Sequence, residues 1–220
     1  MDPQTIATVT NYCTEKLPLA NAKLGDEYYK ASMPLCVIDA VFSISVRYEA
    51  VTNTLRRVCS CYNIAQDARE HGVVPDIQDQ VSTTAFLNML GDKTPDALAR
   101  DVYGNRQRTS ATNGILKAEA VTRFLNVLRD FNAEYFQDIP SILNNNQFEN
   151  AITKIPGQRS GISLKYFFML SGNDDFIKPD RMIIRFLQDA TGKSFSVNEC
   201  QAILYATAVE LNNGGYTVTP

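Results

Sequence analysis

The chain has 220 residues, of which 45% are hydrophobic, enough to bury a sizeable core in one compact unit or two lobes. A formal net charge of −3 argues against a surface that is basic throughout, so any nucleic-acid-binding face is expected to be local. Five cysteines without a C-x-x-C pair predict no disulfide framework and favour a reducing compartment. No apolar run reaches the roughly 18 to 20 residues of a membrane span, and no signal peptide is recognised. These features predict a cytoplasmic protein that does not enter a membrane.

Helical patterns begin at the N-terminus. Residues 3–16 are predicted to form a helix, which Pro18 ends. Residues 34–51 are apolar nearly all round before becoming amphipathic, which is typical of a central helix, and the helical pattern continues to about residue 63. A continuous apolar run is also compatible with a buried strand, but the length favours a helix.

The next stretch, residues 67–82, is polar and is predicted to be a loop. It contains the only histidine, His71, for which a surface position is expected because it lacks spaced metal-ligating partners. Ser82 and Thr94 can then cap two further helices. Residues 105–114 are rich in Arg, Thr, Ser and Asn and are predicted to be a loop, which either faces nucleic acid or forms a mobile tip.

The second half of the chain alternates helices with short breaks. Residues 116–132 form the clearest amphipathic helix, and shorter helices are expected at 140–143, 147–155, 162–171 and 197–211. No strand pattern of useful length occurs. The predicted fold class is therefore all-α, a two-lobed helical bundle with one lobe at 34–172 and the other formed by 1–33 plus 173–220.

The most informative stretch is residues 152–186. Pro156 and Gly157 end one short helix and a second starts at about residue 162, which predicts a helical hairpin with a Pro-Gly-x-x-x-Gly turn. Such a turn directs backbone N–H groups outward at a helix start, where they can bind a phosphate. A third helix opens at Asp180, with Arg181 and Arg185 one turn apart.

This stretch resembles the helix-hairpin-helix DNA glycosylases, the superfamily of endonuclease III and the 3-methyladenine DNA glycosylases. The matching residues are Ile155-Pro156-Gly157 in the hairpin and the segment Asp180-x-x-Ile183-x-Arg185 about two dozen residues later. The resemblance implies a base-excision-repair protein that binds damaged duplex DNA. It also implies Asp180 as the catalytic carboxylate, which stabilises a cation-like sugar and can orient or activate a water. The alternative for Asp180 is ordinary helix capping.

Other residues follow from the same resemblance. The implied DNA contacts come from the hairpin turn and the start of the third helix: Gly157, Gln158, Arg159, Ser160, Gly161, Lys178 and Arg181. Tyr48 and Tyr166 are the candidate aromatic residues of a base pocket, with a plain core position as the alternative for each.

The chain also departs from the family pattern. No lysine follows the second hairpin glycine, whether the turn is aligned directly or with two extra residues, so strand cleavage through a Schiff base is not expected. The glutamine of the family's DNA-inserting segment is absent from residues 41–44, and Arg159 stands where the direct alignment places a glycine. Only Cys200 lies near the C-terminal end, so no iron–sulfur cluster is expected, nor any other cofactor or metal.

Three hypotheses follow from these patterns. The first is a DNA-binding protein of the glycosylase superfamily, a monofunctional hydrolase of the N-glycosidic bond that is cytoplasmic and nucleoid-associated. The second is a nucleic-acid-binding module that lacks the reaction. The third is a helical protein-interaction scaffold whose basic stretch is only solvated surface.

Overall fold

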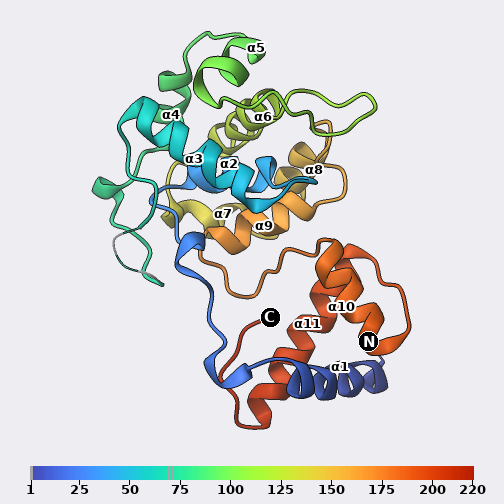
Figure 1. Ribbon diagram of the computed structural model, residues 1–220. Helices are drawn as coiled ribbons and strands as arrows, with labels where there is room; N and C mark the ends of the chain where they lie inside the picture. The colour runs from blue at the N-terminus through green and yellow to red at the C-terminus, as the bar shows by residue number, and fades with distance from the viewer. Residues whose placement is uncertain (1, 69, 71) are drawn as a thin grey trace. The chain divides into compact units, whose positions relative to one another are not determined.

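The computed structural model describes residues 2–68, 70 and 72–220, and within them the regular structure is helical (Figure 1). Strand-like pairing in this described part is limited to two isolated bridges, Lys30 with Asp67 and Arg108 with Leu116. The predicted all-α class is therefore confirmed. His71 lies outside the described residues. No helix in the described ranges has the length and hydropathy needed to cross a bilayer.

The chain divides into two units. One combines residues 1–25 with 173–220, and the other comprises residues 26–172. The first boundary thus follows Gly25 rather than residue 33, because the segment after it pairs with the larger unit. There the N–H of Ala31 donates to the carbonyl of Gln66, and the N–H of Ala68 donates to that of Tyr29.

The larger unit is organised around one helix that is buried along its whole length, α2 (Met33–Phe42). It packs against four other helices, α3 (Tyr48–Tyr62), α4 (Thr83–Leu90), α6 (Lys117–Asp130) and α9 (Ile162–Leu170). The remaining helices of this unit are α5 (Pro95–Ala97), which runs into a π-helix (Leu98–Val102), α7 (Ile139–Ile142) and α8 (Asn146–Thr153). Ser82 and Thr94 cap α4 and α5 through their side-chain oxygens, as predicted.

The predicted continuous helix from residue 34 to residue 63 is wrong, because the chain leaves the helix between Phe42 and Tyr48. Ser45 there adopts a positive φ of 56°. The carbonyls of Phe42 and Ile44, freed at the end of α2, are hydrogen-bonded instead by the ammonium group of Lys117, at 2.9 and 2.7 Å. A side chain remote in sequence thus supplies the partners that a continuing helix would have provided.

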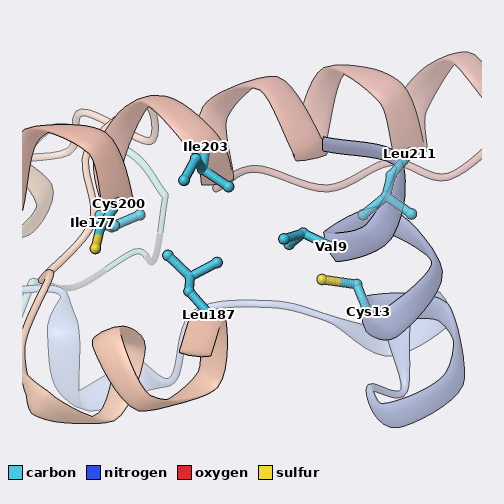
Figure 2. Close-up of a cluster of buried hydrophobic side chains, with 7 residues drawn as sticks. All are labelled: Val9, Cys13, Ile177, Leu187, Cys200, Ile203 and Leu211. Atoms are coloured by element: carbon cyan, nitrogen blue, oxygen red, sulfur yellow. The ribbon is translucent and has the colours of Figure 1, made fainter. Parts of the chain in front are cut away.

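The smaller unit is built from α1 (Pro3–Lys16), α10 (Arg181–Thr191) and α11 (Val197–Asn213), and α1 packs against both other helices. Figure 2 shows the apolar cluster at its centre, with Val9 and Cys13 on α1, Leu187 on α10 and Ile203 and Leu211 on α11 directed toward one another. The two ends of the chain therefore form one core. The predicted bounds of α1 are confirmed, and α11 extends two helical residues past its predicted end at 211.

Candidate functional site

The hairpin predicted around Pro156 is present as α8, a turn over residues 154–161, and α9. Asn145 caps α8 by accepting the N–H groups of Gln147 and Phe148. The arms pack through buried aromatic rings, with the ring centroids of Phe148 and Phe168 6.2 Å apart. Both turn glycines have positive φ, 90° at Gly157 and 72° at Gly161, a conformation that other residues adopt only at a cost.

The turn leaves backbone donors unused. The N–H groups of Gln158 and Gly161 bond to carbonyls within the turn, at 2.9 and 3.0 Å. Among hydrogen bonds between described residues, none uses the N–H of Gly157, Arg159 or Ser160. The side chains of Arg159 and Ser160 are exposed, and residues 154–161 include no acid. The turn thus offers donors and positive charge together at the start of α9, an arrangement that suits an anion.

The same turn is closed on one side by a second segment. A Cβ added to Gly157 would lie 2.3 Å from the Cβ of Thr109, a buried residue in the loop between the π-helix and α6. Gln158 is only 1% exposed, and neither atom of its amide has a hydrogen-bond partner. This corrects the expectation that Gln158 faces DNA, because the turn directs its side chain inward. Buried amide groups of this kind require a partner such as an ordered water.

Asp180 is the N-cap residue of α10. Its Oδ1 accepts the N–H of Met182 at 2.8 Å and that of Ile183 at 3.5 Å. No hydrogen bond from a described residue reaches Oδ2, and the side chain is half-buried rather than sealed. Asp180 belongs to the smaller unit and the hairpin to the larger one. Two neighbours of Asp180 were predicted to contact DNA. Lys178 is half-buried and Arg181 is exposed.

The two aromatic residues predicted for a base pocket meet around one buried carboxylate, Asp39 of α2. The hydroxyl of Tyr48 donates to Asp39 Oδ2 at 3.1 Å, and Tyr166, 1% exposed, interacts with the same group. Lys30 completes the centre with its Nζ 3.4 Å from Oδ2. Burial and the charge of Asp39 raise the pKa of both tyrosines. Tyr166 was predicted to stack on a base in an open pocket. That prediction is wrong, because its ring is buried in the core.

Sequence reasoning did not single out Lys117 as a buried ammonium group. Besides the carbonyls of Phe42 and Ile44, its Nζ donates to Gln107 Oε1 at 3.1 Å, so each of its three hydrogens has an acceptor. Burial lowers its pKa to about 8. With the residue 1% exposed, this amine supports the end of α2 and is not placed to attack a substrate. The only sequence signal was a lysine at the start of an otherwise apolar helix face.

A hollow of about 280 Å³ on the larger unit differs in character from the hairpin turn. Its lining includes four carboxylates, Asp67, Glu70, Asp76 and Asp79, beside apolar side chains. Negative charge of this density repels a phosphate backbone. No group of three or more His, Cys, Asp or Glu within residues 2–68, 70 and 72–220 is arranged to hold a metal ion.

Comparison with known proteins gives one match. The profile of a family described as a domain of unknown function, DUF8548, matches residues 7–220. No curated protein and no solved structure matches the chain.

Proposed function

Because the chain belongs to the DUF8548 family, described as a domain of unknown function, we propose its function from the candidate site and from its resemblance to helix-hairpin-helix glycosylases. It binds duplex DNA through the α8–α9 hairpin and hydrolyses the N-glycosidic bond of a damaged base through Asp180. A hairpin that binds the duplex and a carboxylate that acts on the sugar are the two features that the resemblance to helix-hairpin-helix glycosylases implies.

The observation that carries the proposal is the hairpin turn. Three N–H groups of the turn, those of Gly157, Arg159 and Ser160, are unused by described residues, and the side chain of Arg159 in the same turn is exposed. Backbone donors at a helix start bind phosphate oxygens without reading the sequence, which positions a protein on the duplex. The turn concentrates this charge locally, in a chain whose formal net charge is −3.

The chemistry assigned to Asp180 rests on its two oxygens having separate roles. Oδ1 holds the first turn of α10 and so fixes the orientation of the carboxylate. Oδ2 remains for a water or for the positive charge that develops on the sugar as the glycosidic bond breaks. The three hydrogens of the buried Lys117 amine are all engaged, so it offers no covalent route. Water is therefore the proposed nucleophile, as in a monofunctional glycosylase.

A second candidate function, a DNA-binding module without the reaction, is favoured by one specific observation. Asp180 already serves as a helix cap, and capping alone accounts for an aspartate at this position. In that case the hairpin binds DNA while the carboxylate only stabilises α10. The two candidates share the hairpin and differ only in what Asp180 Oδ2 does.

The deciding experiment compares the wild-type chain with Asp180→Asn on duplexes that carry one alkylated, deaminated or oxidised base. Asparagine caps helices about as well as aspartate, so the variant keeps α10 while losing the negative charge. Asp174→Asn is the matched control, because Asp174 is exposed in the preceding loop and the charge change is the same. Base release that Asp180→Asn abolishes and Asp174→Asn retains supports the hydrolase.

The other outcomes each select an alternative. Equal release by wild type and Asp180→Asn, or no release on any lesion, removes the catalytic assignment and leaves the binding module. Binding that weakens as salt rises and falls further on Arg159→Ala then supports that module. Absence of DNA binding at low salt leaves the third hypothesis, a helical protein-interaction scaffold.

A further inference from the structure

Two segments far apart in the sequence meet at the hairpin turn. The loop at residues 105–114 precedes α6, and its residue Thr109 packs directly on Gly157 of the turn, where an added Cβ would lie 2.3 Å from the Cβ of Thr109. Thr109 is 5% exposed and Gln158, the residue after Gly157, is 1% exposed. The contact therefore buries part of each segment, and the loop and the turn form one continuous surface.

Hydrogen bonds hold the loop in this position. The N–H of Thr109 donates to the carbonyl of Ile115 at 2.9 Å, and that of Lys117 donates to the carbonyl of Gln107 at 2.8 Å. The Arg108 guanidinium reaches across the loop to the carbonyl of Gly114 at 2.7 Å. Arg108 is exposed but tethered, which lowers the entropy lost when it binds an anion.

The two segments carry charge of one sign. Residues 105–114 and 154–161 contain no acid and four cations, Arg106, Arg108, Lys154 and Arg159. Arg106 is neutralised by Asp96 at 3.0 Å. Within the described part of the chain, the other three have no acidic partner. The positive charge left without an acidic partner thus comes from both of the segments that meet at Thr109 and Gly157.

We propose that the loop at 105–114 and the hairpin turn together bind the phosphate backbone of DNA, with Arg108 and Arg159 contacting different phosphates of the same duplex. This two-segment surface rests on the proposed function, since it extends the hairpin's own phosphate contact. Arg108 is one residue from Thr109 and Arg159 is two residues from Gly157. Because Thr109 and Gly157 are in contact, the Cα atoms of the two arginines lie within about 17 Å of each other. That upper limit is about half a helical turn of duplex, a separation that also occurs between phosphates of one duplex.

The test measures binding of a fluorescently labelled 20-base-pair duplex by anisotropy at several salt concentrations. Arg108→Ala and Arg159→Ala are each expected to weaken binding about tenfold and to lower the salt slope by about one. Arg106→Ala is the matched control from the same loop, because it changes the net charge equally but removes an arginine that is already paired with Asp96. It is expected to leave the slope unchanged. Arg108→Lys keeps the charge and is expected to restore most of the affinity.

The outcomes separate this inference from the proposed function. If Arg108→Ala matches Arg106→Ala while Arg159→Ala still weakens binding, the loop plays no part and only the hairpin contact stands. If the wild-type chain binds no DNA, both proposals fall. Binding of anionic phosphatidylglycerol vesicles in place of DNA overturns the choice of partner. Thermal unfolding of each variant shows whether an affinity change comes from a lost contact or from a lost fold.

Discussion

The buried ammonium group of Lys117 gives the most direct quantitative prediction. Lys117→Met keeps a long unbranched side chain and removes both the charge and the three donors that bind Phe42, Ile44 and Gln107. The variant therefore removes a titrating group from the core without opening a large cavity. Comparing the two proteins across pH isolates the contribution of this one amine.

The magnitude follows from the pKa of Lys117, which burial lowers from 10.5 to about 8. Between these values the unfolded chain holds a proton that the folded chain has released, so stability rises with pH. Below pH 8 the folded protein carries the full cost of burying the charge, and above 10.5 that cost is gone. This pKa shift corresponds to about 3 kcal/mol. Between pH 8 and 10.5 the free energy of unfolding of the wild type should therefore rise by that amount relative to Lys117→Met.

The assay is urea unfolding of both proteins at pH values from 7 to 11, with the free energy of unfolding obtained by linear extrapolation. Burial also raises the pKa of Tyr103 and Cys59 in the folded protein, but both groups are common to the two proteins, so their contributions cancel in the difference. Lys154→Met, at an exposed lysine, controls for the loss of one positive charge. A wild-type-minus-variant difference that stays flat between pH 8 and 10.5 would refute the reasoning.

Three further predictions concern stability. Asp39→Asn breaks the buried pair with Lys30 and is expected to lower the free energy of unfolding in urea by about 3 kcal/mol. The double variant Asp39→Leu with Lys30→Met is expected to recover part of this loss. A double variant that is no more stable than Asp39→Asn would contradict the prediction. Leu187→Ala empties the centre of the smaller unit and should lower its unfolding free energy by about 3 kcal/mol, seen as faster amide exchange in α1, α10 and α11. Gly157→Ala should destabilise more than Gly161→Ala, because both glycines have positive φ but only Gly157 has a neighbour within 4 Å. Equal thermal midpoints for these two variants would mean that Thr109 moves aside for the added methyl group at little cost.

Helix positions were largely predictable because their signals are local. Ser82 and Thr94 cap the helices they precede, and residues 3–16 form α1 as expected. Such signals act through hydrogen bonds within a few residues, which a sequence displays directly. The break between α2 and α3 was missed, and the group that binds the carbonyls of Phe42 and Ile44 there is Lys117, a residue far along the chain.

The candidate site shows the same limit. Two turn glycines and a helix-opening aspartate are visible in the sequence, and the structure places them in a hairpin and at a cap. The burial of Gln158, the contact of Thr109 with Gly157 and the packing of Tyr166 around Asp39 are not visible there. Each depends on segments that approach one another only after the helices have packed.

The sequence by itself determined an all-helical chain, because apolar periodicity, caps and positive-φ glycines specify helices and their ends through short-range interactions. Only the tertiary structure decided which polar groups remain available. Packing placed Lys117 and Asp39 inside the core and left Arg159 at the surface of the hairpin turn. The residue types determine charge and hydrogen-bonding capacity. Whether a side chain can reach a binding partner depends on which parts of the fold cover it.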